Sequence, residues 1–400
     1  MSVAFSGTEG RDQHSRVHSR PNPGFLERLG ETMGGMMVGV VLFFVSFYVL
    51  FTNEGRAIRT AASLDEGLSQ VLTLHPDMYV DPQNNNRLIH LSAPLRTSQP
   101  LYDPNYKVAV QAVKLKRNVE MYQWVEYQDS REYKEGGETK TETTYTYNTE
   151  WKSEVINSRN FDKEIGHINP SAMAVESVTV VAPDVWVGYF FLSKGLIDQI
   201  NNFQTLHLGG LPATDPFLTV HEDYFYHTAN PRRPEVGDVR VSFSYAGLSG
   251  EGSFPGPPQT VSVVAMQKEE RLMPFKTQSG DTLEILYLEE LTAEEVFAKE
   301  HQLNDMKTWA LRAGGWFLMF LSISLTTRII YTLVDWVPVL RDLVSVGLKL
   351  FALCVSCCLS LLIIAAGWLF YRPLLAGLIA ALALVPILIA RSRAPDKKHQ

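Results

Sequence analysis

The residues 221–227, HEDYFYH, are the closest approach to a chemical site in this sequence. Alternate side chains of a strand share one face. On a single strand, His221, Asp223 and His227 would therefore present imidazole and carboxylate groups together, a set that suits Zn²⁺. Histidines among aromatic residues are more often ordinary half-buried side chains, and we predict no metal site and no cofactor.

Catalytic motifs are missing from the sequence. The stretch Gly247-Leu248-Ser249-Gly250 lacks the G-x-S-x-G spacing that exposes a nucleophilic serine on a sharp turn. No phosphate-binding P-loop, dinucleotide fingerprint or H-E-x-x-H pair occurs either. We therefore expect no catalytic residue and no enzyme activity.

Arg328 is the one clear ionisable residue inside an apolar run. Such residues mark ion or substrate pathways by default, and Ser324, Thr326 and Thr327 would be the other polar groups of a channel. Arg328 lies about six residues from the end of its run, so its long side chain also reaches the membrane surface. A channel, or a protein that regulates channels, is an alternative interpretation.

The composition divides the chain into two chemically different parts. Apolar runs lie near residue 40 and in the last 90 residues, whereas residues 32–310 carry 23 basic and 36 acidic side chains. An acidic surface argues against nucleic acid as a partner. Cys354, Cys357 and Cys358 all lie in an apolar run, so the polar part has no disulfide framework. A domain of about 260 residues can bury a sufficient core without one.

Four apolar segments are long enough to cross a bilayer as helices. A cleaved signal peptide is disfavoured for the first, because a polar stretch precedes it and no small-residue cleavage site follows. Pro373 suits the first turn of the last helix, so the last two segments form a tight helical hairpin. The predicted spans are residues 33–52, 312–334, 346–370 and 373–390.

Basic residues near the spans predict their orientation, since Lys and Arg concentrate on the cytosolic side. This rule places residues 1–32, 335–345 and 391–400 in the cytosol or nucleoplasm, and residues 53–311 in the lumen. Lys397 and Lys398 form a KKxx end, a pattern that cytosolic retrieval machinery reads as an address for the endoplasmic reticulum. A basic tail next to a span also explains these lysines.

The polar part is predicted to be an α+β domain in which sheet predominates. Two strands, 121–128 and 139–151, flank a Gly136–Gly137 turn and predict a hairpin. Amphipathic helices are expected to continue the first span through residue 72 and to lead from a capping box at 292–295 into the second span. Further strands are expected at 178–187, 239–245, 260–266 and 283–288, and a short helix at 192–203.

Small residues one helical turn apart predict helix contacts in the membrane. Gly35 and Gly39 in the first span form a GxxxG pair, and Gly377 and Ala381 repeat the spacing in the fourth. Small residues let helix backbones approach closely. These four residues are the predicted packing contacts, within one bundle or in a homo-oligomer.

Eight stretches resemble the LUMA family, also called transmembrane protein 43, and they cover nearly the whole chain. They are FLERL (25–29), FTNEGRA (51–57), VEMYQWVE (119–126), KEIGH (163–167), NPSAMAVES (169–177), EVGDVRVSFSYAGLSG (235–250), TLVDW (332–336) and AAGWLFYRPL (365–374). The N-terminal 20 residues and residues 76–100 agree least.

The resemblance implies a four-span protein of the endoplasmic reticulum and inner nuclear membrane. It implies a large lumenal domain, cytosolic or nucleoplasmic tails, self-association, and a scaffold role among nuclear envelope proteins, with emerin and lamins as partners. It carries no catalytic residue. A lumenal lipid-binding or enzymatic domain is the remaining alternative, based on the residues 221–227 and the large predicted sheet.

Overall fold

The chain forms two compact units, which are described separately. The structure is a computed structural model, and it describes residues 12–209, 216–228, 230–251, 254–334 and 337–392. The sheet unit takes the chain up to Asn22 together with Val71–Phe275 and Glu284–Ala293. The helical unit takes Pro23–Gln70, Lys276–Leu283 and the chain from Glu294 onward.

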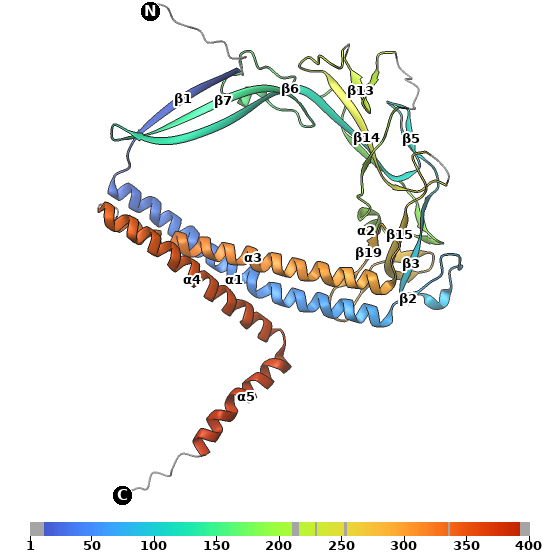
Figure 1. The fold of residues 1–400 in the computed structure, drawn as a ribbon. Coiled ribbons are helices and arrows are strands. Elements are labelled where there is room, and N and C mark those ends of the chain that lie inside the picture. The colour runs from blue at the N-terminus through green and yellow to red at the C-terminus, as the bar shows by residue number, and fades with distance from the viewer. Residues whose placement is uncertain (1–11, 210–215, 229, 252–253, 335–336, 393–400) are drawn as a thin grey trace, which may run out of the picture. The chain divides into compact units, whose positions relative to one another are not determined.

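The larger sheet of the sheet unit is built around a long hairpin (Figure 1). Its strand order is β1-β7-β6-β14-β13-β12, with β8 paired to β6 and β11 paired to β14. The strands are β1 (Asp12–Pro21), β6 (Ala112–Glu135), β7 (Glu138–Lys152), β8 (Val178–Val181), β11 (Gln204–Thr205), β12 (Thr219–His221), β13 (Tyr224–His227) and β14 (Val239–Leu248).

The second sheet has seven strands in the order β19-β15-β16-β10-β9-β3-β2. Because β15 also pairs with β3, five of these strands close into a ring of pairings. The strands are β2 (Leu72–Thr73), β3 (Leu88–Thr97), β9 (Val185–Val187), β10 (Phe190–Phe191), β15 (Thr260–Lys268), β16 (Arg271–Met273) and β19 (Ile285–Tyr287). Short elements join them: β4 (Leu101–Asp103), β5 (Val108–Val110), α2 (Lys194–Asp198) and 3-10 turns at Pro82–Asn84 and Ser158–Asn160.

One hydrophobic core joins the two sheets. Side chains alternate across a strand, and β14 follows this rule, with Val241 and Phe243 buried between half-buried neighbours. They pack in the same cluster as Val119 of β6 and Val263 of β15, which belong to different sheets. Burial of this apolar surface is the main force that holds the unit together.

The expected sheet-rich α+β domain is confirmed, and its hairpin is formed by β6 and β7. Gly136 and Gly137 have φ values of 62° and 80°, the left-handed pair that a two-residue hairpin turn requires. The prediction of one strand at 178–187 was wrong, because β8 and β9 are separated around Pro183, which has no N–H to donate to a ladder. The helix expected at 192–203 is limited to α2.

The strand β1 is an element that the sequence pattern did not predict. It pairs with β7 in an antiparallel ladder from Asp12–Tyr147 to Pro21–Glu138. The predicted topology places β1 and β7 on opposite sides of a bilayer. Strands that share hydrogen bonds must lie on the same side of the membrane. One molecule therefore cannot contain both this ladder and a first helix that crosses the membrane.

The helical unit consists of α1 (Phe25–Gln70), α3 (Ala293–Leu333), α4 (Pro338–Phe370) and α5 (Pro373–Ser392). In the part of the chain that the structure describes, three helices are long and apolar enough to cross a membrane, namely α1, α3 and Val339–Phe370 of α4. The apolar stretch of α5, Pro373–Pro386, is shorter, and the fourth span therefore stays a prediction. The helix α4 begins at Pro338, because proline fits the first helical turn, and the predicted span 346–370 lies within this helix.

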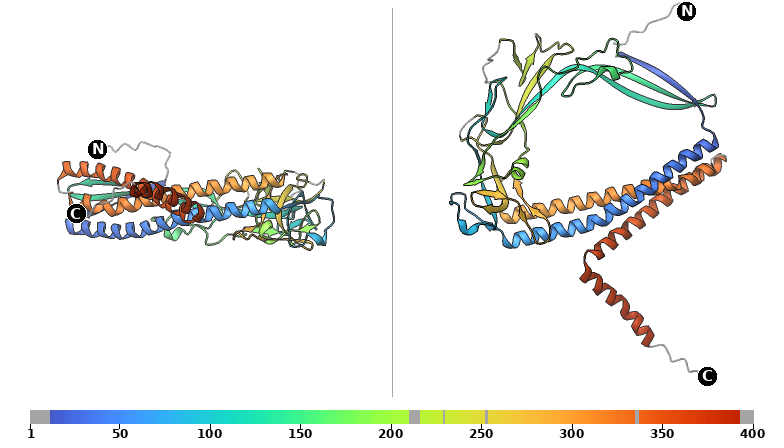
Figure 2. Two further views of the ribbon diagram at one scale, coloured as in Figure 1. Left: turned by 90° about the horizontal axis from the view of Figure 1, so that it is seen from below. Right: turned by 180° about the vertical axis from the view of Figure 1, so that it is seen from behind.

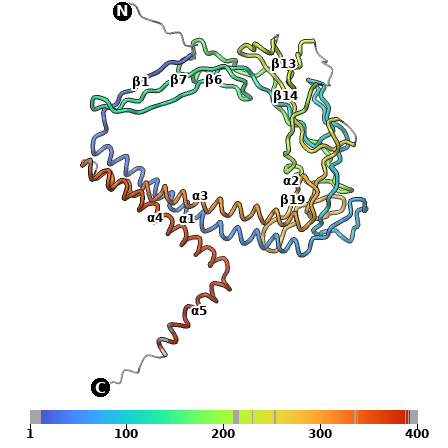
Figure 3. The backbone as a smooth tube through the Cα atoms, viewed as in Figure 1, coloured from blue at the N-terminus to red at the C-terminus, as the bar shows by residue number. Residues whose placement is uncertain are grey.

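The helices α1 and α3 lie side by side although more than 200 residues separate them in the sequence (Figures 2 and 3). With 46 and 41 residues, they extend roughly 70 and 60 Å, about twice the hydrocarbon thickness of a bilayer. The expected helical continuations of the first and second spans are thus confirmed, except that α1 ends at Gln70 and Leu72, which was included in the first continuation, begins β2. A hairpin of β17 (Phe275–Lys276) and β18 (Thr282–Leu283) joins this unit through its turn at residues 277–281.

Candidate functional site

Buried polar contacts recur along the line where α1 meets α3, which we call the seam. Ser46 donates to the Gly315 carbonyl at 2.6 Å, and Ser322 donates to the Gly39 carbonyl at 2.7 Å. The seam pairs are Thr32–Thr332, Gly39–Ser322, Ser46–Gly315 and Asn53–Thr308. The α1 members are seven residues apart, the period that keeps one face of a helix against a partner in a coiled coil.

The prediction of helix contacts from the sequence did not include this seven-residue period. Small and polar residues recur every seventh position in α1, and Thr308, Gly315 and Ser322 do so in α3. A search for apolar periodicity passes over such positions. In an apolar environment these hydroxyls and amides must find partners, and each seam residue finds one on the neighbouring helix.

Gly39 is a point of close approach in the seam. A Cβ atom at this position would lie 2.7 Å from the Thr326 hydroxyl and 2.9 Å from the Ser322 carbonyl oxygen. At Gly35 the nearest atom, in Leu325, would be 4.0 Å away. At Gly377 no atom lies within 4 Å, and Ala381 is exposed on the same helix, α5. The structure therefore places Gly39 inside the bundle and leaves the Gly377–Ala381 face open.

An ion pair marks the end of the apolar part of the seam. Glu54, 2% exposed, accepts two hydrogen bonds from the Arg312 guanidinium at 2.7 and 2.9 Å. The Arg312 guanidinium also lies over the Trp309 ring at 4.7 Å. On α4, Gly367 leaves room for Glu54, because a Cβ there would lie 3.3 Å from the Glu54 side chain. The pair thus connects α1 and α3 where α4 also packs.

Arg56, two residues farther along α1, is held by neutral acceptors. It donates to the amide oxygens of Asn53 and Asn304 and to the Thr308 hydroxyl, with the shortest bond at 2.8 Å. Burial lowers its pKa below the ordinary value, despite the opposing field of Asp281. Within the described residues, no carboxylate contacts this guanidinium directly.

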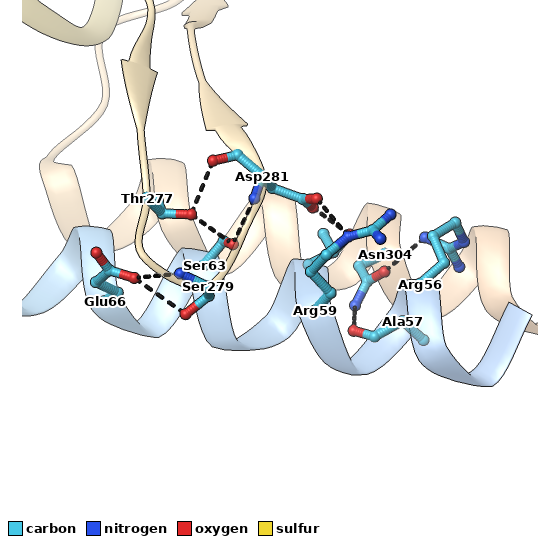
Figure 4. A network of polar contacts seen from close by, with 10 residues as sticks. Arg56, Ala57, Arg59, Ser63, Glu66, Thr277, Ser279, Asp281 and Asn304 are labelled. Atoms are coloured by element: carbon cyan, nitrogen blue, oxygen red, sulfur yellow. Dashed lines mark hydrogen bonds and ion pairs between the residues drawn. The ribbon is translucent and has the colours of Figure 1, made fainter. Parts of the chain in front are cut away.

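The C-terminal part of α1 binds the turn that joins β17 and β18 (Figure 4). Arg59 pairs with Asp281 at 2.8 Å, and Ser63 shares a hydrogen bond with Thr277. Glu66 accepts from the backbone N–H groups of residues 278 and 279, which lowers its pKa below the ordinary value of 4.5. These contacts fix the turn on one face of α1.

A cavity of about 850 Å³ lies beside this network. Its wall combines aromatic side chains, arginines and small polar groups, among them Tyr48, Thr52, Arg56, Arg59 and Tyr371. The lining offers hydroxyls and positive charge, but no carboxylate, imidazole or thiol that would activate a nucleophile. The described lining has the chemistry of a binding or packing site.

The structure does not bring the residues 221–227 together as a ligand set. Glu222 and Asp223 have φ values of 48° and 63° and form the turn between β12 and β13, so the single strand assumed for these residues was wrong. Asp223 bonds with His207, whereas His227 bonds with the Tyr106 hydroxyl at 2.8 Å. Within the described residues no group of three potential metal ligands is found.

A buried polar cluster of the sheet unit surrounds Tyr106. Arg117 donates to Asp103 at 2.8 Å, and both side chains are buried. Burial raises the pKa of Tyr106 to about 12, so its hydroxyl stays protonated beside His227. The Asp103 carboxylate also accepts from the Tyr106 backbone N–H at 3.1 Å. These polar groups have their hydrogen-bond partners within the fold, and we interpret the cluster as a structural one that helps to hold the sheet unit together.

The remaining predicted residues lie on the helical unit or outside the described chain. Arg328 is exposed on α3, Thr326 donates to the Ser322 carbonyl, and Thr327 donates to the Ile323 carbonyl. Cys354, Cys357 and Cys358 are free thiols on α4. Lys397 and Lys398, the predicted retrieval signal, lie outside the described residues.

Comparison with known proteins identifies the family. The family profile described as Transmembrane protein 43 matches residues 121–373. The chain is 58% identical to "Transmembrane protein 43" of Mus musculus and of Homo sapiens, over 400 residues and the full length of each protein. It is 33% identical to the "Transmembrane protein 43 homolog" of Drosophila melanogaster over 348 residues, which is 85% of this chain and 89% of the relative. No solved structure matches the chain. This chain, a multi-pass membrane protein, belongs to the transmembrane protein 43 family.

Proposed function

We propose that this protein is a four-span scaffold of the endoplasmic reticulum and inner nuclear membrane that self-associates and organises nuclear envelope complexes. In the proposed orientation the sheet unit faces the lumen, and both tails face the cytosol or nucleoplasm. Emerin and lamins are the proposed partners, on the basis of the family resemblance. The choice of membrane rests on that resemblance and on Lys397 and Lys398.

The open face of α5 is the observation that carries self-association. Gly39 is already packed within the chain, whereas a Cβ atom added at Gly377 would have no atom within 4 Å, and Ala381 is exposed. Small residues one turn apart let two membrane helices approach closely. A second copy of α5 is a partner that presents the same small residues.

Substitution of the small residues tests self-association. Gly377→Ile with Ala381→Ile should shift the protein toward monomers in chemical cross-linking and in single-molecule photobleaching in membranes. Gly34→Ile on α1 is the matched control, since Gly34 also has no atom within 4 Å. A wild-type protein that is monomeric at every membrane density would exclude the self-association.

A proximity-labelling experiment tests the scaffold role. A biotin ligase fused to the N-terminal tail should label emerin and lamins, and Lys397→Ser with Lys398→Ser should move the protein out of the endoplasmic reticulum. Recovery of no envelope protein above a ligase targeted to bulk reticulum would reject the envelope role.

A glycosylation scan tests the topology. The chain has no natural Asn-x-Ser/Thr acceptor in which x is not proline, so an acceptor inserted at the Gly136–Gly137 turn or after Gln400 reports its own side of the membrane. A glycan at the turn alone is expected. A glycan after Gln400 alone would invert the orientation and remove the basis for a KKxx signal.

A further inference from the structure

A second cavity of the helical unit lies between α3 and α4 and has a volume of about 230 Å³. Arg328 and Tyr331 of α3 line it, and so do Ser345 and Lys349 of α4. The cavity lies close to the end of α3 and in the first half of α4. Two basic side chains from different helices therefore share one hollow.

Within the described residues, these two cations have no ion-pair partner. Arg312 pairs with Glu54 and Arg59 pairs with Asp281, but within the described residues no carboxylate pairs with Arg328 or Lys349. Two like charges that line one cavity repel each other, the more so where the surroundings are apolar. An anion placed between them would remove this cost.

The hydroxyl groups of the cavity are open as well. Among the described residues, the side-chain hydroxyls of Ser324, Tyr331 and Ser345 have no hydrogen-bond partner, although all three line the cavity. Only Thr327 is engaged, by the Ile323 carbonyl of its own helix. Three hydroxyls, one guanidinium and one ammonium thus converge as free donors. Phosphate oxygens, which accept several charge-assisted hydrogen bonds at once, match this set.

The surroundings of the cavity are apolar and exposed. Ile330 on α3 and Val346 and Leu350 on α4 are each more than two-fifths exposed. In a bilayer such side chains contact acyl chains. Basic pockets between membrane helices near the cytoplasmic surface are suited to anionic headgroups. The volume is below the roughly 300–1,000 Å³ of a site that encloses a whole small molecule, and it suits one phosphate group.

We propose that the cavity between α3 and α4 binds the phosphate group of an anionic membrane phospholipid, with Arg328 and Lys349 as the cationic ligands. The acyl chains lie along the apolar surface around Val346 and Leu350. The site does not depend on the scaffold role, because it needs only the two helices in a bilayer.

Native mass spectrometry of the full-length protein tests the site. The protein in detergent is titrated with phosphatidylinositol 4-phosphate as the probe, and with phosphatidylcholine as the neutral reference. The wild type should retain one anionic lipid preferentially. Arg328→Gln and Lys349→Gln should each weaken retention roughly fivefold, the factor that corresponds to about 1 kcal/mol for one basic residue at a membrane surface. Arg328→Lys should retain most of the binding, since the charge stays.

The control is Arg391→Gln, which removes one exposed charge from the last turn of α5 and leaves the cavity intact. It should bind the lipid like the wild type. An equal loss of lipid retention in Arg391→Gln and Arg328→Gln would show that the lipid is attracted by the general positive charge of the protein. This result would overturn the proposed site. A Tyr331→Phe variant should lose part of the retention with its thermal unfolding unchanged.

Inorganic phosphate distinguishes the two sources of the ligand. The lipid should remain bound when inorganic phosphate is added at high concentration with ionic strength held constant. Displacement of the lipid under these conditions would show a site for free phosphate and overturn the assignment to a lipid. Lack of any preference of the wild type over the Arg328→Gln, Lys349→Gln double variant would overturn the anion site itself.

Discussion

Four arginines of the helical unit lie in four different electrostatic environments. Arg312 is matched by the buried Glu54, and Arg59 by Asp281 at the turn. Arg56 is surrounded by neutral oxygen atoms, and Arg328 faces an open cavity. These differences separate structural charges, whose partners are within the fold, from charges that are available to a ligand.

The Glu54–Arg312 pair gives the first prediction. Glu54→Gln should destabilise the helical unit by about 3–5 kcal/mol, because it leaves the Arg312 charge without its partner in a buried place. Thermal unfolding in detergent, followed by fluorescence-detected gel filtration, measures the loss. The double variant Glu54→Gln, Arg312→Gln should recover part of it, since both charges are then removed. A double variant as unstable as the sum of the single variants would contradict a direct interaction.

Glu66 gives a prediction about pH. Its pKa is lowered because the ionised form accepts hydrogen bonds from residues 278 and 279. Its contribution to stability is therefore complete above its ordinary pKa of 4.5 and is lost as the pH falls through the lower folded value. Glu66→Gln should lower the melting temperature at neutral pH and reduce its fall toward acid pH. Glu132→Gln, an exposed carboxylate of β6, is the control and should change neither.

At the scale of elements, the seam sets how closely α1 and α3 approach. We predict that Gly39→Ala destabilises the protein by about 1–3 kcal/mol, the usual cost of overpacking, because its Cβ would clash with Ser322 and Thr326. Gly34→Ala, at a position with no atom within 4 Å, should be neutral or slightly stabilising because alanine favours helix. Chemical denaturation of both variants in the same detergent compares them. Equal changes in the free energy of unfolding would show that the close approach at Gly39 does not affect stability.

The elements could be predicted from the sequence where one local signal was sufficient. The Gly136–Gly137 turn with its flanking aromatic and β-branched residues predicted β6 and β7 correctly, and long apolar runs predicted α1, α3 and α4. The helix expected at 192–203 ended at Asp198, because Ile200 packs into the core from a loop and not from a helical face. Tertiary packing, and not the apolar spacing alone, determined where this helix ends.

The candidate site was less predictable than the elements. Ser46 and Gly315 are 269 positions apart, and no local pattern shows that one donates to the carbonyl of the other. Arg328 was recognised as unusual, but its companion Lys349 was assigned to no site, because the contact between α3 and α4 that brings them to one cavity is tertiary. The assumed face of His221, Asp223 and His227 failed because a turn interrupts it.

At the scale of the whole molecule, the ladder between β1 and β7 competes with insertion of α1. The proposed topology separates the two strands by the bilayer, and we predict that the inserted protein does not form the ladder. A protein with Arg16→Cys and Thr143→Cys, which face each other across the ladder, should then give no intramolecular disulfide in microsomes under oxidising conditions.

Two further measurements make this experiment decisive. The native cysteines 354, 357 and 358 are replaced by serine to remove other thiols, and Glu132→Cys with Thr141→Cys, a pair across the β6–β7 hairpin, serves as the positive control. A disulfide between positions 16 and 143 in the inserted protein would show both strands on one side. The proposed orientation of α1 would then be wrong.

The seven-residue interval of the seam also limits how the protein can respond to its bilayer. Seven residues rise roughly 10.5 Å along a helix, so sliding of α1 against α3 by less than one interval would separate Ser46 and Ser322 from their carbonyl partners. Beyond the seam, α1 also holds the turn of β17 and β18 through Glu66 and Arg59. We therefore expect α1 and α3 to tilt as one body in a thicker or thinner membrane. A change in bilayer thickness around the apolar part of α1 would then also reorient the end of α1 that binds the turn of β17 and β18.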